Sequence, residues 1–297
     1  MYKFCFVCTV LNREKDIKKF LESMLEQDYD NNNYAIAVVD NGSTDKTLEL
    51  ISEYTHNNNL IVIDGSLVKG SPYSARNMVI NSVDADNYCF MDGYPERNYL
   101  KKANQIELDN SIVAGRIIIE TSDSSSVYEL YDSVFNLDNE KIINKFQRAP
   151  TGNLIINRKV FQKLGLFDEK IRSGGDMIYT SNATRCGFKI SYDSQLISKY
   201  YARNKIQLLK KMKRVAKGQV GIWQSEKKVF FYLSKSIIKL ILPNNPVLTF
   251  KYIDSRLKQD KCIRTKFFIM CIHEYIRMVM AYTNIVEFIS KRRAWKS

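Results

Sequence analysis

The segment IAVVDNGSTDKTLEL (residues 36–50) places a carboxylate and turn-forming residues directly after an apolar run. The run predicts a buried strand, and Asp40 stands at its carboxyl end, where open α/β sheets bind ligands. Ser43 or Thr44 can cap a following helix that Asp45 helps to start, so we expect unpaired backbone N–H groups in this loop. A nucleotide suits such a loop. Taken alone, the segment is equally consistent with an ordinary strand-to-helix connection that carries an exposed Asp.

The beginning of the chain repeats this arrangement. The apolar run FCFVCTVL (residues 4–11) contains Thr9 and is followed by Asn12 and then by a predicted helix. The expected buried face of that helix is Ile17, Phe20, Leu21, Met24 and Leu25. Two strand ends with polar side chains therefore converge on one expected cleft.

With these two segments, the chain resembles the family 2 inverting glycosyltransferases, which begin with a strand, T-x-x-N, a helix, and a strand that ends in D-[DN]-G-S-T-D. The corresponding residues here are 9–12 and 40–45. The resemblance extends over about residues 3–200 through four further segments in the family's order: 69–77, 90–96, 151–171 and 173–188. It implies an α/β GT-A fold: a Rossmann-like nucleotide-binding mixed sheet flanked by helices, here with a helical C-terminal extension.

The resemblance assigns nucleotide binding to the first half of the chain. The residues that it implies are Thr9, Asn12, Asp40, Asn41, Arg76 and Asp92. Many relatives carry a second Asp where this chain has Asn41. Because an amide donates as well as accepts hydrogen bonds, this position does not identify the nucleobase, and we take uridine as the default.

An inverting transfer needs a carboxylate that takes the proton of the attacking acceptor hydroxyl. Asp176 in SGGD (residues 173–176) matches the family's general base and precedes a predicted helix. The alternative is an Asp that merely caps that helix. Gly152, Asn153 and Gly175 are expected on the acceptor side, although Asn153 also suits a turn before a strand.

The metal-side residues depart from the family pattern. The resemblance implies a divalent cation, Mg²⁺ or Mn²⁺, but D-x-D is replaced by Asp92, Gly93 and Tyr94, which leaves Asp92 as the expected ligand. Tyr200 and Tyr201 stand where the family often has a His. The sequence thus indicates weak or absent metal binding. Glu96 could replace the missing metal ligand, and Lys69, Arg76 or Arg203 could balance the charge of the leaving group in place of a metal ion.

Composition fits one α/β domain plus an extension, and we expect a GT-A domain over residues 1–203 and a helical extension over 204–297. The six cysteines are scattered, which is typical of reduced thiols in a cytosolic protein. Cys5 and Cys8 form C-x-x-C on a predicted strand, where they point to opposite faces and do not suit a zinc site. The N-terminal apolar run is too short for a signal peptide.

Charge divides the chain sharply. Residues 1–198 carry a net charge of −5 and residues 199–297 one of +18. Within the basic part, residues 227–241 and 266–289 predict amphipathic helices, and central Glu274 and Arg277 argue against a membrane span. We expect these helices to lie on an anionic membrane surface at its cytoplasmic face. The alternative is that they pack on the catalytic domain; nucleic acid is not expected as a partner.

Two other functional classes compete with glycosyl transfer. A nucleotidyltransferase is disfavoured because TVLNREKD (residues 9–16) lacks the glycines of its phosphate loop. A catalytically weak or inactive nucleotide-sugar-binding scaffold at the membrane is the closer alternative, because Tyr94 replaces the metal Asp. The donor sugar, the acceptor, the linkage and the oligomeric state are not determined by these motifs.

Overall fold

The computed structural model describes residues 1–66, 71–136, 138–171, 173–257 and 261–294. The chain packs as two compact units. The first, which we call the sheet unit, comprises residues 1–118 and 138–200; the second, the helical unit, comprises residues 119–137 and 201–297. The predicted division at residue 203 did not include the internal segment 119–137, which packs with the C-terminal helices.

In the described part of the chain, eight strands form one mixed sheet in the order β3-β2-β1-β4-β7-β6-β8-β5. The strands are β1 (Tyr2–Val10), β2 (Tyr34–Asp40), β3 (Leu60–Asp64), β4 (Ala85–Met91), β5 (Tyr94–Pro95), β6 (Ser111–Glu120), β7 (Asn153–Asn157) and β8 (Lys189–Tyr201). Strands β1 to β4 are parallel, and β7 is antiparallel to β4. The carboxyl ends of the first four strands therefore meet at one edge of the sheet.

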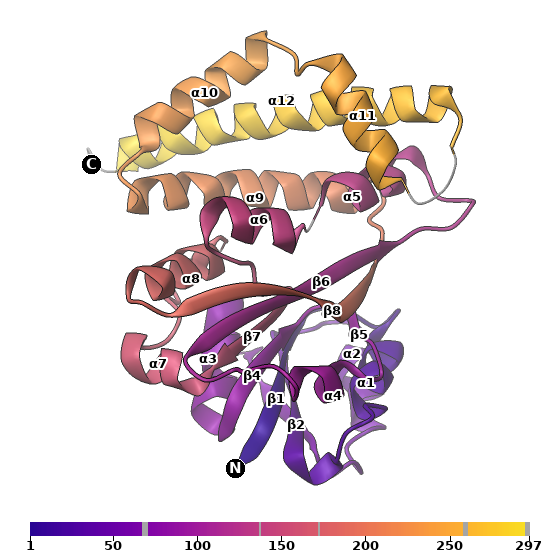
Figure 1. Ribbon diagram of the computed structural model, residues 1–297, viewed down its shortest axis with the longest axis vertical. Coiled ribbons are helices and arrows are strands. Elements are labelled where there is room, and N and C mark those ends of the chain that lie inside the picture. The colour runs from indigo at the N-terminus through magenta and orange to yellow at the C-terminus, as the bar shows by residue number, and fades with distance from the viewer. Residues whose placement is uncertain (67–70, 137, 172, 258–260, 295–297) are drawn as a thin grey trace. The chain divides into compact units, whose positions relative to one another are not determined.

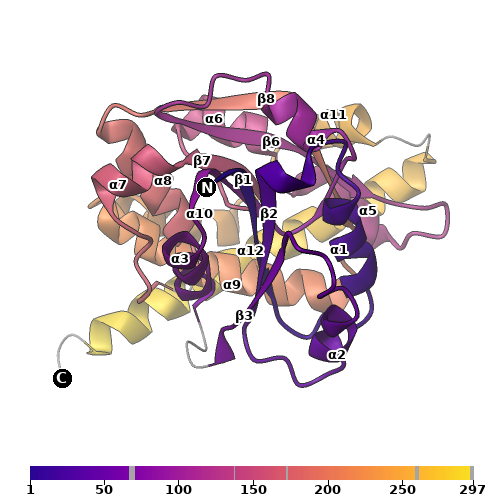
Figure 2. The same cartoon turned by 90° about the horizontal axis from the view of Figure 1, so that it is seen from below.

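Helices cover both faces of this sheet (Figures 1 and 2). On one face lie α1 (Ile17–Leu25), α2 (Thr47–Ser52) and α4 (Tyr99–Ala103). On the other lie α3 (Pro72–Ser82), α7 (Arg158–Leu164) and α8 (Gly175–Arg185), and the sheet unit also contains α6 (Asn139–Phe146). Alternate residues of β1 supply the two cores: Cys5 and Val7 face the second set of helices, while Phe4, Phe6 and Cys8 face the first.

Helix α1 confirms the N-terminal prediction. Its buried residues are Ile17, Phe20, Leu21 and Met24, and Leu25 is half-buried against the same core. The predicted cap of α2 was wrong, because the Ser43 and Thr44 side chains do not bond to its first turn. Instead, the Asp45 carboxylate accepts a hydrogen bond from the backbone N of Thr47, the first residue of the helix, at 3.0 Å.

The helical unit contains α5 (Val127–Phe135), α9 (Lys205–Ser225), α10 (Val229–Ile241), α11 (Pro246–Arg256) and α12 (Ile263–Ala294). Its core joins residues that are distant in sequence: Leu130 and Val134 of α5 pack with Leu208 of α9, Ile253 of α11 and Ile276 of α12. The helices predicted for residues 227–241 and 266–289 are thereby confirmed as α10 and α12. Helix α12 shares this core with α5 and α9, and α10 packs against α12 and α9, so the segment is not a detachable tail.

Three polar side chains of α12, which we call its polar stripe, face inward: His273, Arg277 and Asn284. Asn284 is buried and donates to Gln219 and Ser236, and the Arg277 guanidinium donates to the Lys239 carbonyl of α10. His273 stacks on Phe135, with ring centroids 4.1 Å apart. Ile269 and Ile276 of α12 are buried in the core, whereas Phe267, Met278 and Tyr282 are left exposed to solvent.

Candidate functional site

Asp40 ends β2 and organises the loop that follows it. Its carboxylate is 1% exposed and accepts hydrogen bonds from the backbone N of Gly42 (3.1 Å), the backbone N of Ser43 (2.9 Å) and the Ser43 hydroxyl. Gly42 has a φ of +87°, which is why a glycine suits this turn. The strand-end carboxylate thus fixes the loop shape at the edge where ligands bind in such sheets.

Asn12 fixes the same loop from the side of β1. Its Oδ1 accepts from the backbone N of Thr44 at 2.8 Å, and its own backbone N donates to the Ser43 hydroxyl at 2.9 Å. The backbone N of Asn41 donates to the Val10 carbonyl at 2.9 Å. The N–H groups of residues 41–44 therefore have protein acceptors, and our expectation of unpaired N–H groups in this loop was wrong.

Thr9 and Asn41 place polar side chains beside this loop, at the carboxyl ends of β1 and β2. Thr9 is half-buried and lies beside Val39 in the parallel register of β1 and β2. The Oδ1 atom of Asn41 is buried without a hydrogen-bond partner among the described residues. A buried acceptor without a donor is costly, and the described residues leave this amide oxygen unsatisfied.

Arg76 and Asp92 meet at the next strand end. Arg76 projects from α3 with only 7% of its side chain exposed, and its Nη2 lies 3.7 Å from Asp92 Oδ1. Asp92 follows β4 and leaves 46% of its side chain exposed. The structure thus brings two predicted nucleotide-side residues together, as a buried cation beside an accessible carboxylate.

Asp176 lies at the start of α8 and is half-buried. Its Oδ2 accepts from the backbone N (3.0 Å) and the hydroxyl (3.1 Å) of Thr151, and its Oδ1 accepts from the Tyr73 hydroxyl (3.1 Å) and the Met177 backbone N (2.9 Å). The N-cap position is Gly174, which has no side-chain cap. Besides its own helix, Asp176 is therefore held by donors from α3 and from the turn before β7, which a plain helix cap does not require.

Sequence reasoning missed Tyr73 and Thr151 as partners of Asp176. Their bonds to it span 103 and 25 residues of sequence, and the hydroxyl residues carried no periodic signal. Both lie within segments quoted for the family resemblance, 69–77 and 151–171, which was the one available indication.

The side chains expected near the metal ion, except Asp92, make other interactions. Burial and a hydrogen bond to Asp16 raise the pKa of Tyr94, whose hydroxyl donates to that carboxylate. Asp16 also pairs with Arg13 at 3.0 Å, and Glu96 lies 3.6 Å from Lys102. Within the described ranges, no group of three His, Cys, Asp or Glu side chains could hold a metal ion. Asp92 is the accessible carboxylate that remains at these positions, beside Arg76.

Tyr200 explains the glycine at position 93. A Cβ on Gly93 would lie 2.4 Å from the Tyr200 ring, and a Cβ on Gly152 would lie 2.9 Å from the Tyr200 hydroxyl. That hydroxyl donates to the Gly152 carbonyl. The tyrosine at the expected His position therefore fills the space beside Asp92. Tyr201, its neighbour, is exposed.

The three acceptor-side residues have different environments. Gly152 lies next to Thr151, and Gly175 precedes Asp176, so both line the surroundings of the carboxylate. Asn153 is fully buried: it donates to the carbonyls of Arg116 (3.0 Å) and Leu196 (2.9 Å) and accepts from Tyr99 (2.7 Å). Its amide joins strands of the sheet, which is a structural role and leaves no surface for an acceptor contact.

The other two candidate cations do not join this group. Arg203 belongs to the helical unit, where it pairs with the buried Asp132 at 3.1 Å. Lys69 lies outside the described residues. Arg76 is thus the cation that the described sheet unit supplies beside Asp92.

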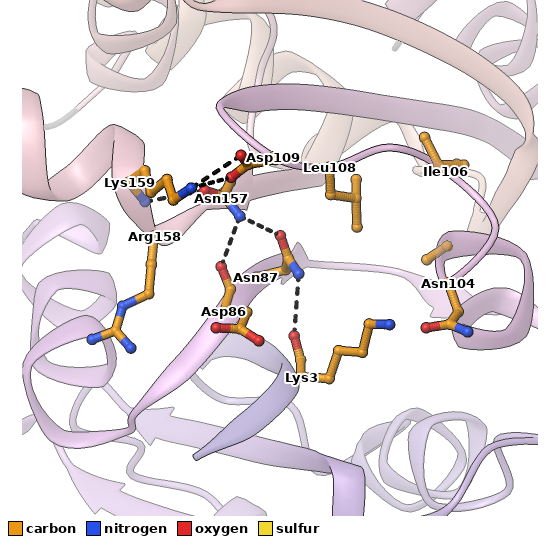
Figure 3. Close-up of a pocket in the computed structure, with 11 residues that line it drawn as sticks. Lys3, Asp86, Asn87, Asn104, Ile106, Leu108, Asp109, Asn157, Arg158 and Lys159 are labelled. Carbon is orange, nitrogen blue, oxygen red and sulfur yellow. Dashed lines mark hydrogen bonds and ion pairs between the residues drawn. The ribbon is translucent and has the colours of Figure 1, made fainter.

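A hollow of about 380 Å³ lies at the opposite end of these strands and includes Lys3 and Asp86 (Figure 3). Its polar groups bond to one another: Asn157 donates to Asn87 at 2.9 Å, and Lys159 pairs with Asp109 at 2.7 Å. Because its residues come from the amino ends of β1 and β4, it is separate from the edge that carries Asp40 and Asp92.

Comparisons with known proteins match the chain to one family. The family model for glycosyl transferase family 2 matches residues 5–165. Glycosyltransferase AglE of Haloferax volcanii is 30% identical over 248 residues, which cover 81% of this chain and 81% of that protein.

Two solved structures share the fold. The crystal structure of S. aureus TarS 1–349 in complex with UDP-GlcNAc has a TM-score of 0.55 at 18% identity, covering 98% of this chain and 92% of that chain. Mannosyltransferase PcManGT from Pyrobaculum calidifontis, in complex with GDP-Man and Mn²⁺, has a TM-score of 0.57 at 13% identity, covering 98% and 75%. At these identities the likeness concerns the fold alone.

Proposed function

Because the chain belongs to glycosyl transferase family 2 and has the GT-A fold, we propose that it moves a sugar from a UDP-sugar to a hydroxyl of a glycan or a lipid-linked acceptor, with inversion. The observation that carries this proposal is the network Asp92–Arg76–Tyr73–Asp176. It links a nucleotide-side ion pair to a carboxylate that accepts hydrogen bonds from α3 and from the turn before β7.

In the proposed mechanism, Asp176 is the general base. The acceptor oxygen attacks the anomeric carbon from the face opposite the nucleotide, and a new C–O bond forms while the bond from that carbon to the diphosphate oxygen breaks. The proton of the acceptor hydroxyl passes to a carboxylate oxygen of Asp176, and the nucleoside diphosphate leaves with the electron pair. Thr151 and Tyr73 hold the carboxylate in place, which limits the reorganisation that the transfer needs.

The nucleotide is proposed to lie over the ends of β1, β2 and β4. Asp40 and Asn12 keep the loop in shape, Thr9 and the free Oδ1 of Asn41 face the base and ribose, and Arg76 approaches the diphosphate. The TarS neighbour binds UDP-GlcNAc on a related fold, which supports UDP as the default carrier.

We propose that the leaving-group charge is balanced by Arg76 rather than by a divalent cation. The PcManGT neighbour binds Mn²⁺, so a protein of this fold can bind a divalent cation. In this chain, however, Tyr94 bonds to Asp16 and Tyr200 fills the space beside Gly93. A buried guanidinium offers several donors to diphosphate oxygens and needs no metal ligands.

The helical unit is proposed to lie on the cytoplasmic face of an anionic membrane. Its surface exposes large apolar side chains, among them Phe230 (73%), Ile241 (72%) and Ile263 (77%). The inward-facing polar stripe of α12 leaves apolar residues outside, and residues 199–297 carry a net charge of +18. None of the described helices is long and apolar enough to cross a bilayer. Exposed apolar groups among cations suit insertion into an anionic leaflet.

The central test replaces Asp176 by Asn and measures nucleotide release from UDP-GlcNAc, UDP-glucose and GDP-mannose, together with UDP binding by calorimetry. The amide can keep its oxygen toward the Thr151 N–H while the Tyr73 hydroxyl turns to accept from the amide, and the one bond lost is that from the Met177 N–H. We therefore expect a folded variant with UDP affinity within a few-fold of wild type and turnover reduced by about a hundredfold or more.

The matched control is Asp109→Asn, which loses an exposed pair with Lys159 at the far edge and should keep its turnover. Undiminished turnover of Asp176→Asn would exclude Asp176 as the base. A wild-type protein that binds UDP but turns over no donor in the presence of varied glycan and lipid acceptors would favour the nucleotide-sugar-binding scaffold instead.

A further inference from the structure

Tyr73 occupies a space that only a glycine opposite it allows. It lies in the first turn of α3 and is 3% exposed, with its ring 5.7 Å from the Phe167 ring. A Cβ on Gly175 would approach three Tyr73 ring carbons at 2.8, 2.9 and 3.1 Å. Any side chain at position 175 would therefore displace the ring, so the glycine before Asp176 and the tyrosine on α3 form a matched pair.

The ring position brings the Tyr73 hydroxyl to Asp176. It donates to Oδ1 at 3.1 Å, while Thr151 donates twice to Oδ2. Burial, followed by the charge of Asp176, raises the pKa of Tyr73, so the hydroxyl keeps its proton and remains a donor. Donors on both carboxylate oxygens fix the plane of the group, and only the Tyr73 donor reaches it from α3.

The same helix turn also carries Arg76. The guanidinium carbon of Arg76 lies 5.4 Å from the centre of the Tyr73 ring, and the guanidinium pairs with Asp92. Helix α3 is tied to the segment that leads to α8: Ser71 donates to the Ile171 carbonyl at 2.9 Å, and Asn77 donates to the Phe167 carbonyl at 2.9 Å. Arg76, which pairs with Asp92, and Tyr73, which donates to Asp176, therefore lie on one helix that is bonded to the segment before α8.

We propose that Tyr73 is the positioning residue for the general base, aiming the Asp176 carboxylate from the helix turn that also carries the nucleotide-side Arg76. This inference rests on the proposed function, in which Asp176 is the base. Tyr73 itself transfers no proton and touches no reacting atom; its effect on turnover passes through the orientation of Asp176. Its loss should therefore lower kcat and leave donor binding in place.

The test compares Tyr73→Phe with Tyr88→Phe in the full chain. Both tyrosines are 3% exposed in the same core, but the Tyr88 hydroxyl donates to the Val83 carbonyl at 2.8 Å, away from the site. With UDP-GlcNAc or the best donor of the panel, we expect kcat of Tyr73→Phe to fall about tenfold, with UDP affinity and donor KM within about twofold of wild type. Tyr88→Phe should lose thermal stability to a similar extent and keep its kcat.

A second pair of variants tests the steric match. Gly175→Ala should lower kcat as Tyr73→Phe does, because its methyl group pushes the ring away from the carboxylate. In a Tyr73→Ala background, the same methyl group should cost little further kcat, since the ring that it displaces is gone.

The outcomes separate this inference from the proposed function. If Asp176→Asn is inactive while Tyr73→Phe and Tyr88→Phe share the same kcat, Tyr73 is a plain core residue and the inference is overturned. It is also overturned if Tyr73→Phe weakens UDP binding as much as it lowers kcat. If Asp176→Asn remains active, the proposed base fails, and the inference fails with it.

Discussion

Removing the Asp40 carboxylate should have two separable effects, one on stability and one on nucleotide binding. In Asp40→Ala, the backbone N atoms of Gly42 and Ser43 and the Ser43 hydroxyl lose their acceptor. Each bond to a charged acceptor is worth about 1.5 to 3 kcal/mol, but the loop is partly exposed and water can replace the acceptor in part. We therefore expect the free energy of unfolding to fall by about 1 to 3 kcal/mol in total.

Asp45→Ala supplies a matched control for the stability effect. The Asp45 carboxylate also accepts three hydrogen bonds in the same region, from the backbone N and hydroxyl of Thr47 and from the backbone N of Glu14 at 3.2 Å. Its loss should also lower stability through the loss of these bonds. A difference in UDP binding between the two variants then reports on the strand-end position rather than on loop stability.

Calorimetric titration with UDP gives the deciding comparison. We expect Asp40→Ala to bind UDP more weakly than Asp45→Ala by about 1 to 3 kcal/mol, which corresponds to roughly 5- to 150-fold in Kd. Thermal melts of both variants check that the titrated proteins are folded. Equal UDP affinities in the two variants would show that Asp40 only shapes the loop, and would refute its assignment to the nucleotide.

Three further outcomes are expected. Wild-type protein should sediment with anionic liposomes and detach in part as salt rises, whereas Phe231→Glu with Tyr282→Glu should reduce sedimentation at all salt concentrations; binding that ignores lipid charge would contradict the proposed membrane surface. Chelation with EDTA should leave UDP affinity and turnover unchanged, and a tenfold loss would revive a metal at Asp92. Burial lowers the pKa of His273 in the folded protein. Below about pH 6.5, the pKa of an unfolded histidine, the unfolded chain therefore binds more protons than the folded one. The thermal midpoint should consequently fall as the pH drops from 7 to 5.5. In His273→Phe that fall should be smaller, as scanning calorimetry can measure.

Removing the chain from residue 222 onward is not a clean test of membrane binding. The core of the helical unit joins Leu130 and Tyr131 of α5 with Met212 of α9 and Ile269 of α12. A truncated protein would expose this apolar surface and should be insoluble. Surface substitutions are therefore the informative variants.

Local sequence pattern determined the elements that position the site. The apolar runs predicted β1 and β2, the periodicity from Ile17 to Met24 predicted α1, and Asp40 was correctly placed at a strand end. These features depend on neighbours within a few residues, so a single sequence carries them. The motif order also identified the family, and the comparisons confirm it.

Tertiary structure decided which polar groups are available. Asn153 and Tyr94 stood at expected site positions, yet one is buried between strands and the other bonds to Asp16. The N–H groups of Gly42, Ser43 and Thr44 are taken by side chains, and the polar stripe of α12 faces inward. Each outcome depends on which elements the sheet order and helix packing bring together. The Tyr73 to Asp176 bond joins residues 103 apart in sequence, and no local pattern encodes a contact of that separation.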